Sequence, residues 1–463
     1  MVFGLIKKLF GRDESASPPP SSFASTQAPL PMAAGPLKDG LGAAPGEAGQ
    51  IAGAPAETML QREIVLDREL KVIGYDFRLR DSVLKRKERM AHSVWKLYDE
   101  VLLRNFLAEE STKAFGQKRI FLEVSVWALQ SPLLGQLPKG RFVLMLHYDA
   151  EYFQNAVEHV ELLQALKEHG FQIGFDSFPL KADLMALMPL ADYHKISVTD
   201  KDVTELSKEV SAVANAAPES ELIMGDIHFF EELQVCRQLQ VHLLQGSYLR
   251  RKELSEVDTV DASYLRLLEV LNLVRSEADP SVIANAMKYD PMLSFKLLRY
   301  VNSPGAGLLT KIDTLDRAMI VLGNKQLYRW LTLLLFSHER QEGDHSILLE
   351  TALIRGRIME VLGAKQFKRD ELDQLFTTGM FSMLDSLLRQ PMPVILEKLS
   401  LPDEINQALL NRGGRFGPML SLALTCENGD LPDDLEIFNQ AGVTKAEANK
   451  AQIDALLWVE EVV

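Results

Sequence analysis

Residues 141–178 read RFVLMLHYDAEYFQNAVEHVELLQALKEHGFQIGFDSF, and this stretch decides the fold class of the first half of the chain. The runs at 141–149 and 171–178 are short, apolar and rich in aromatic and branched residues, which is typical of buried strands. Residues 150–170 carry apolar side chains at helical spacing and end in Gly170, a common helix stop. A strand, a helix and a second strand in this order predict one unit of a parallel sheet.

The same alternation continues on both sides of this unit, from about residue 60 to residue 250. Further strand-like runs lie at 62–67, 71–77, 119–126, 193–198, 221–227 and 242–249, and further helical patterns at 182–190, 206–218 and 229–240. Repeated units of this kind predict either an open doubly wound sheet or a TIM-like barrel. The region is short for a full barrel of eight units, so we expect one or two units to be missing or replaced.

Residues 251–463 have a different character, because helical patterns follow one another and no convincing strand pattern occurs. Asp279 and Asp290 each precede a proline, which suits a helix N-cap followed by Pro at the first helical position. We therefore predict an α/β domain over residues 60–252 and an all-α domain over residues 253–463.

The segment before residue 60 is predicted to be a tether. Residues 13–59 are rich in Pro, Ala, Gly and Ser, so they bury too little apolar surface to offset the entropy of ordering, and we expect a disordered linker. Residues 1–12 form a short amphipathic element. Its apolar face consists of Val2, Leu5, Ile6, Leu9 and Phe10. This face indicates docking on a protein partner or contact with anionic lipid, and the alternative is a frayed terminus with incidental apolar residues.

Composition narrows the function classes. The chain has 463 residues and a formal net charge of −14, which argues against a general nucleic-acid binder because phosphate backbones are held mainly by Lys and Arg. No stretch approaches the ~20 apolar residues that cross a bilayer, and the first residues lack a secretory pattern. The two cysteines, Cys236 and Cys426, lie far apart and fit a reducing compartment. We expect a cytoplasmic protein that reaches a membrane-associated complex at most through residues 1–12.

Four short motifs in the first half occur in the order of one known family. They are GYDFRLR at 74–80, GFDSF at 174–178, ADYHKI at 191–196 and LQGSY at 244–248. In these motifs the region resembles the EAL domain, the cyclic di-GMP phosphodiesterase fold. The resemblance implies a TIM-barrel-like domain, and the changes in its motifs imply a degenerate one.

The resemblance also implies a site for metal ions, which in phosphodiester hydrolysis acidify a water and clamp the phosphate. The signature Glu of the family is Asp76 in this chain, and the family's Asn on the next strand aligns with Glu123. Its Glu on the strand after that aligns with Met145, which offers only a soft thioether.

Later ligand positions are changed as well. The second residue of the family's Asp-Asp pair is Ser177, and a later Glu falls on Gly225, or on Met224 or Asp226 with a shift of one residue. Its downstream partner resembles His228. We therefore predict neither catalytic residues nor a metal site nor a cofactor. A relict nucleotide pocket, or a set of purely structural ion pairs, would be formed by Asp76, Arg80, Glu123, Asp176, Lys195 and Gln245.

The second half carries a different resemblance, in DPMLSFKLLRYVNS at 290–303, AMIVLG at 318–323 and LFTTGMFSMLD at 375–385. In these stretches it resembles the HDOD domain, the helical relative of metal-dependent HD phosphohydrolases. The His-Asp pair of those enzymes would lie near Ser382 and Met383, which offer no ligand. His338 and His345 belong to a polar stretch that we interpret as a solvated loop.

The two resemblances together imply a bacterial EAL–HDOD signalling protein. We expect a non-catalytic scaffold that binds signalling, motility or pilus proteins, in cyclic di-GMP-linked control of motility, pili or surface attachment. One alternative is a sensor that binds cyclic di-GMP without hydrolysis. The other is a phosphodiesterase with unorthodox ligands, using Asp76, Glu123 and Asp176.

Overall fold

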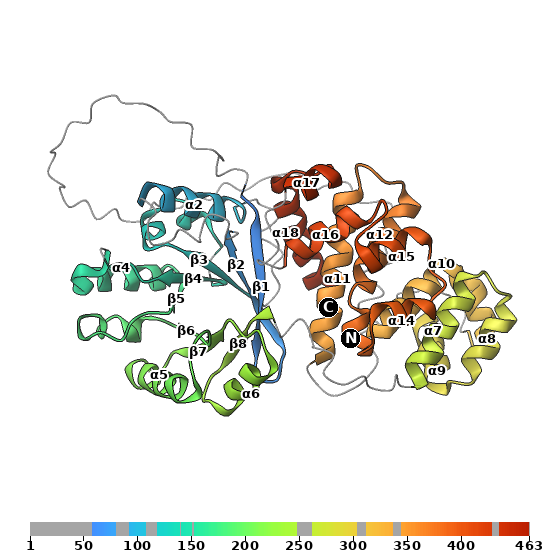
Figure 1. The fold of residues 1–463 in the computed structure, drawn as a ribbon, viewed down its shortest axis with the longest axis horizontal. Coiled ribbons are helices and arrows are strands. Elements are labelled where there is room, and N and C mark those ends of the chain that lie inside the picture. The colour runs from blue at the N-terminus through green and yellow to red at the C-terminus, as the bar shows by residue number, and fades with distance from the viewer. Residues whose placement is uncertain are drawn as a thin grey trace, which may run out of the picture.

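The computed structural model describes residues 58–79, 92–107, 118–138, 140–150, 152–247, 262–302, 312–336, 344–427 and 435–462. Within these residues the chain forms two parts that lie side by side, one of strands and helices and one purely helical (Figure 1). Residues 1–12 with their predicted docking face, Arg80, and the linker as far as residue 57 lie outside the described residues.

The first part is a closed barrel of eight strands in sequence order. The strands are β1 (Leu60–Asp67), β2 (Val72–Leu79), β3 (Arg119–Val124), β4 (Phe142–His147), β5 (Gln172–Asp176), β6 (Tyr193–Ser197), β7 (Glu221–Gly225) and β8 (Leu243–Gln245). Strand β1 is antiparallel to both of its neighbours, β2 and β8, and the other pairs are parallel. The predicted TIM-barrel-like fold class is confirmed, and closure excludes the open sheet.

The connections between the strands contain few regular helices in the part of the chain that the structure describes. Four α-helices lie between strands of the barrel there: α2 (His92–Arg104), α4 (Ala156–Glu168), α5 (Val203–Ala216) and α6 (Phe230–Gln238). The 3-10 turn η5 (Tyr152–Asn155) precedes α4, η3 (Val126–Gln130) and η4 (Leu134–Gln136) join β3 to β4, and η6 (Ala182–Leu184) and η7 (Met188–Leu190) join β5 to β6. The expectation of missing units is therefore wrong for the strands, although two crossover helices are replaced by turns.

The stretch 182–190, predicted to be one helix, forms η6 and η7 instead. Pro189 lacks a backbone N–H, and in a continuous helix its ring would clash with the carbonyl group four residues earlier. The chain therefore makes two short turns before it enters β6.

The barrel interior has its own apolar cluster. It consists of Val65, Phe121, Val143, Met145, Tyr193, Ile223 and Leu243. The rings of Phe121 on β3 and Tyr193 on β6 meet edge to face with centroids 5.2 Å apart, although their strands are not neighbours in the sheet. This contact crosses the interior, so the barrel is a packed core rather than a channel.

The second part is all helical, as predicted. Its helices are α7 (Ala262–Arg275), α8 (Pro280–Lys288), α9 (Pro291–Val301), α10 (Leu315–Phe336), α11 (Asp344–Gly363), α12 (Arg369–Phe381), α13 (Leu384–Leu388), α14 (Met392–Glu397), α15 (Asp403–Asn411), α16 (Gly417–Thr425), α17 (Leu435–Ala441) and α18 (Lys445–Val462). Asp279 and Asp290 cap α8 and α9 as their prolines predict. Among the described residues, no helix combines the length and the apolar character needed to cross a membrane.

Strand β1 joins the two parts through its backbone. Strand β8 pairs only with residues 65–67 of β1, so the N-terminal half of β1 extends past it. The helical part binds this extension. Leu60 N donates to Asn449 Oδ1 at 2.8 Å, and Gln452 Nε2 donates to Leu60 O at 3.1 Å. Arg62 N donates to Cys426 O at 3.2 Å. Helix α18 and the end of α16 thus cover what would otherwise be an exposed sheet edge.

Buried charges reinforce this joint. Glu427 lies between two arginines, with Arg62 Nη2 of β1 at 3.4 Å from Oε1 and Arg355 Nη2 of α11 at 2.8 Å from Oε2. All three side chains are buried. Burial lowers the pKa of Arg62, and Glu427 opposes this effect by stabilising its charge.

A second polar contact lies beside the first. Lys118 Nζ is 2.5 Å from Glu350 Oε1 of α11 and 2.8 Å from Glu460 Oε1 of α18. The hydroxyl of Tyr75 on β2 also donates to Glu350. The barrel and the helical part therefore share ion pairs on β1 and just before β3, and a buried hydrogen bond on β2.

We predict that Glu427→Gln lowers the free energy of unfolding by about 3 kcal/mol, because it leaves two buried arginines without their counter-charge. Urea unfolding of the full chain measures the change. The control is Glu100→Gln, which removes an exposed ion pair with Arg104 at 2.6 Å and should cost about 0.5 kcal/mol or less. Equal losses in the two variants would contradict the prediction.

Candidate functional site

The barrel interior changes from apolar to polar towards the carboxyl ends of the parallel strands. Side chains two residues apart share a face of a strand, so strands that supply an apolar side chain to the inner cluster supply another group one step nearer the mouth. We call this layer the mouth ring. It consists of Glu63, Asp76, Glu123, His147, Asp176, Lys195, Gly225 and Gln245, one residue from each strand.

Lys195 is the centre of the mouth ring. Its Nζ lies 3.2 Å from Glu123 Oε1, 3.5 Å from Asp76 Oδ2 and 3.6 Å from Asp176 Oδ2. The side chain is buried, and burial by itself would lower its pKa. Asp176, Glu123 and Asp76 outweigh burial and hold the pKa of Lys195 well above its usual range. The ammonium group is therefore a fixed positive charge among three carboxyl groups.

The other side of the ring is held by an amide and a guanidinium group. Gln245 Nε2 donates to Asp76 Oδ2 at 2.7 Å and to Glu63 Oε2 at 2.8 Å. Arg78 lies two residues after Asp76 on β2. Its Nη1 is 3.7 Å from Glu123 Oε1, and its Nη2 is 4.0 Å from Glu63 Oε2. Sequence analysis missed Glu63 because β1 is the antiparallel strand, and no motif of the resemblance covers it.

The carboxyl groups of the ring differ in acidity. Burial raises the pKa of Asp76 to about 7, against the opposing effect of Lys195. Burial would raise the pKa of Glu123 too, but Lys195 and Arg78 outweigh it and hold that pKa well below its usual range. Asp76 is thus the ring's proton acceptor near neutral pH, whereas Glu123 stays ionised.

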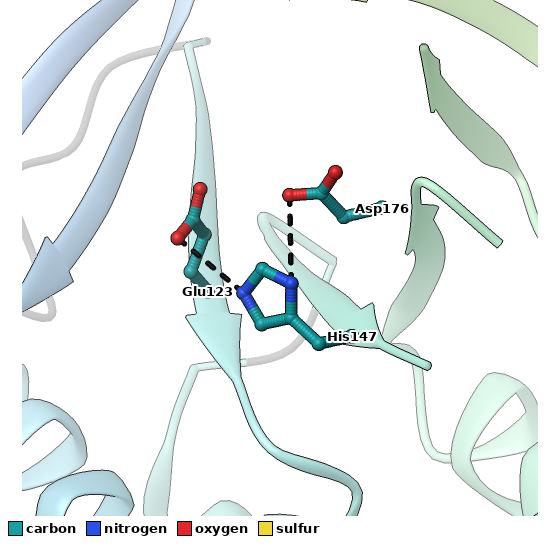
Figure 2. A group of neighbouring side chains, drawn as sticks. All are labelled: Glu123, His147 and Asp176. Atoms are coloured by element: carbon teal, nitrogen blue, oxygen red, sulfur yellow. Dashed lines mark ion pairs between the residues drawn. The ribbon is translucent and has the colours of Figure 1, made fainter. Parts of the chain in front are cut away.

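His147 is a second ring residue that sequence analysis failed to identify. It lies between two carboxylates, with Nε2 3.4 Å from Glu123 Oε2 and Nδ1 3.6 Å from Asp176 Oδ2 (Figure 2). The motif alignment had placed the family's Glu on Met145, which is buried in the inner apolar cluster. Counting two residues further along the strand-like run 141–149 would have brought His147 to the mouth.

The remaining aligned positions contribute little to the ring. Ser177 Oγ donates to Asp176 Oδ1 at 2.9 Å. Gly225 brings no side chain, and a Cβ there would lie 2.7 Å from Lys195 Cε, so the stem of Lys195 fills the space where a longer residue would stand. Met224 is buried in the core, and His228 is an exposed residue whose Nδ1 lies 2.7 Å from Ser247 Oγ.

A pair of hard divalent cations does not fit this ring. Glu123, His147 and Asp176 offer ligand atoms within 4.8 Å of one another, which suffices for one ion with mixed nitrogen and oxygen ligands. The ammonium of Lys195 already lies 3.2 Å from Glu123 Oε1 and 3.6 Å from Asp176 Oδ2. A second ion would need oxygen ligands that Met145 and Gly225 cannot supply.

The space beside the ring is small. A hollow of about 20 Å³ is lined by Arg78, Leu79, Trp95, Tyr98, Asp99, Leu102, Glu123 and His147. That volume accommodates a water molecule rather than a nucleotide. Burial raises the pKa of Asp99 to about 7, although Ser125 donates to it through N at 2.9 Å and through Oγ at 2.5 Å.

The position of the lost HD site in the helical part is also filled. Arg355 Nη1 donates to Ser382 Oγ at 3.0 Å while the same guanidinium binds Glu427. Met383 is buried and apolar. His338 lies outside the described residues, and His345 begins α11 with a side chain that is not described. A buried arginine therefore stands where the resemblance places the family's metal ligands.

We predict that Asp76→Asn changes how stability depends on pH. An unfolded Asp titrates near pH 3.9, whereas folded Asp76 has a pKa of about 7. Between these values the folded state binds a proton that the unfolded state releases, so the stability of the parent protein falls as pH rises. The free energy of unfolding of the variant, relative to the parent, should therefore rise by about 3 kcal/mol from pH 4 to pH 7.

Urea unfolding at several pH values measures this difference. Asp183→Asn, at an exposed residue of η6, is the matched control and should run parallel to the parent. Parallel curves for Asp76→Asn and the parent would contradict the prediction.

Comparison with known proteins gives one family and several distant relatives. The family model of the HDOD domain matches residues 258–391. The chain is 23% identical over 406 residues to the uncharacterized protein YuxH of Bacillus subtilis, covering 86% of this chain and 97% of that protein. It is 21% identical over 406 residues to the cyclic di-GMP phosphodiesterase CdgJ of Vibrio cholerae, covering 88% and 93%.

Among solved structures, the EAL domain of FimX from Pseudomonas aeruginosa bound to cyclic di-GMP matches with 17% identity and a TM-score of 0.34. That match covers 42% of this chain and 90% of that domain. The matched HDOD region spans α7 to α13, and helices α14 to α18 continue beyond it. The chain therefore contains an HDOD domain behind a closed eight-stranded barrel.

Proposed function

We propose that this chain is a non-catalytic signalling protein of a bacterium, which acts by binding protein partners in a cyclic di-GMP-linked pathway. Control of motility, pili or surface attachment is the process that the resemblance suggests. In this proposal the barrel contributes structure, and the HDOD domain contributes the surface that partners recognise.

The mouth ring is the observation that carries the proposal. The positively charged Nζ of Lys195 lies between the carboxyl groups of Asp76, Glu123 and Asp176. The stem of the same side chain fills the volume above Gly225. A phosphodiesterase centre needs cations that activate a water and clamp the phosphate, and this ring neutralises its carboxylates with its own side chains.

Two alternatives remain useful because specific features favour each. A sensor that binds cyclic di-GMP is favoured by the cations Arg78 and Lys195 at the mouth and by the similarity to CdgJ, whose name is that of a cyclic di-GMP phosphodiesterase. An enzyme with unorthodox ligands is favoured by the cluster of Glu123, His147 and Asp176. Such a cluster suits a transition metal better than magnesium.

We predict no turnover of cyclic di-GMP by the purified full chain with magnesium, manganese or zinc, because the ring cannot hold two cations. Chromatography for the linear product measures turnover. Metal-dependent hydrolysis that Asp176→Ala abolishes and the exposed control Asp183→Ala preserves would overturn the proposal in favour of the enzyme. Calorimetry with cyclic di-GMP on the same samples distinguishes the sensor from the scaffold. Binding without product supports the sensor, whereas the absence of a heat of binding supports the scaffold.

We also propose that residues 1–12 bind a groove on a protein partner, with residues 13–59 as the tether. A coil of about 45 residues spans ~35–40 Å, which lets the segment reach a partner at a distance from the folded body. Leu5→Asp/Leu9→Asp should delocalise the protein in cells, because it destroys the apolar face. Lys7→Gln/Lys8→Gln should not, since each basic residue adds only ~1 kcal/mol near an anionic membrane. The prediction is contradicted if Leu5→Asp/Leu9→Asp localises normally. It is also contradicted if Lys7→Gln/Lys8→Gln alone loses its localisation.

A further inference from the structure

Helix α9 and Tyr289, the C-cap of α8, present large apolar side chains to solvent. The exposed fraction is 76% for Tyr289, 56% for Met292 and 57% for Phe295. Met292 and Phe295 are three residues apart, so they lie on one face of α9. Helices α7, α8 and α9 form the end of the helical part that is farthest from the barrel (Figure 1).

The fold does not need these side chains for packing. Helix α9 is anchored by its opposite face, where Leu293, Leu297, Tyr300 and Val301 are buried. Exposed apolar groups that gather in one place are characteristic of interaction sites, whereas scattered ones are common on any surface.

The exposed residues adjoin a small groove of about 10 Å³ between α7, α9 and α10. The groove is lined by Ser263, Leu267, Asp290, Met292, Leu293, Lys296 and Leu334. The guanidinium group of Arg266 on α7 lies over the ring of Tyr289 at 5.6 Å, so α7 contacts the turn between α8 and α9. We call Arg266, Tyr289, Met292, Phe295 and Lys296 the α7–α9 surface.

The charge of this surface selects its partner. Its ionised side chains that face outward, Arg266 and Lys296, are positive, although the whole chain has a net charge of −14. The carboxylate of Asp290 in the groove is already engaged, because its Oδ1 accepts from Leu293 N at 2.9 Å as the N-cap of α9. The surface therefore complements a ligand that carries both apolar and acidic groups.

We propose that the α7–α9 surface binds an amphipathic helix of a partner protein whose apolar face is flanked by acidic residues. Apolar anchors at helical spacing would pack on the exposed side chains of Met292 and Phe295, while flanking carboxylates would face Arg266 and Lys296. The N-terminal segment of this chain is a poor occupant, because Lys7, Lys8 and Arg12 give it the same charge as the surface. The proposal rests on the proposed function, in which the HDOD domain binds proteins.

The test uses two synthetic peptides of about five helical turns with the same leucine face. One has glutamates on its polar face and the other has lysines. Fluorescence anisotropy with the full chain should show at least about tenfold tighter binding of the glutamate peptide. Met292→Asp/Phe295→Asp should weaken that binding at least about tenfold. The control is Leu410→Asp, which also replaces an exposed apolar residue by aspartate, at a 52% exposed leucine of α15, and should change nothing.

A charge exchange makes the test specific. Arg266→Glu/Lys296→Glu should reverse the preference, so that the lysine peptide binds more tightly than the glutamate peptide. Far-ultraviolet circular dichroism and the melting temperature establish whether each variant is folded, a check that Arg266→Glu/Lys296→Glu needs because both residues are half-buried. The proposal is overturned if neither peptide binds, if both bind equally, or if the charge exchange leaves the preference unchanged.

Two further results would assign the surface to another occupant and overturn the proposal. If the parent sediments as a dimer and Met292→Asp/Phe295→Asp sediments as a monomer, the occupant is a second copy of this chain. If deletion of residues 1–12 raises the affinity for the glutamate peptide at least about tenfold, the occupant is the N-terminal segment. Neither result bears on cyclic di-GMP turnover, so failure here is distinguishable from failure of the proposed function.

Discussion

Strand β1 is the element on which the rest of the structure depends. It is the one strand whose two ladders are both antiparallel, and its pairing with β8 closes the barrel. Its N-terminal half then finds its remaining backbone partners on the helical part, at Cys426, Asn449 and Gln452. Neighbouring residues of β1 even face opposite ways, since Glu63 binds Gln245 inside the mouth while Arg62 binds Glu427 outside. The two halves of the chain are thus parts of one continuous packing arrangement.

The mouth ring has the geometry that any barrel of parallel strands imposes, whereas its chemistry depends on the particular side chains of this chain. Parallel strands end together, so their terminal side chains converge whatever those side chains are. In this chain they converge as four carboxyl groups, a lysine, an amide and a histidine that pair with one another, although Asp76 Oδ1 and Gln245 Oε1 have no hydrogen-bond partner among the described residues. Mutual satisfaction of buried charges favours rigidity, because every displaced partner would leave a charge without compensation.

Much of this fold could be predicted from the sequence, because each strand carries its own apolar run. All eight predicted runs are strands, but their alternation fits an open sheet as well as a barrel. Closure depends on the pairing of residues 65–67 with 243–245, a contact that no local pattern encodes. Residues 182–190 were wrongly predicted to form one helix. The prediction followed the helical spacing of their apolar residues and disregarded Pro189.

The site was predicted in part for a similar reason. Asp76, Asp176, Lys195 and Gln245 belong to motifs, and Glu123 follows from their alignment; the structure brings all five together, while their role stays a prediction. His147 was missed because the alignment stopped at Met145, one pleat too early for the mouth. The buried contacts of Arg62, Glu427 and Arg355 link residues far apart in the chain, so no local sequence pattern predicts these contacts.

The attachment of β1 to α18 also has a consequence for the order of folding. The hydrogen bonds of Leu60 reach Asn449 and Gln452, which are 389 and 392 positions away. A ribosome releases the N-terminus first, so all eight strands leave it long before α18 (Lys445–Val462) does. Until then the outer half of β1 is an open edge, the kind of edge that pairs with other chains. During synthesis the nascent chain therefore has a stage in which β1 is complete but α18 has not yet been made. The edge of β1 is unpaired during that stage, so incorrect pairing with other chains is then most favoured.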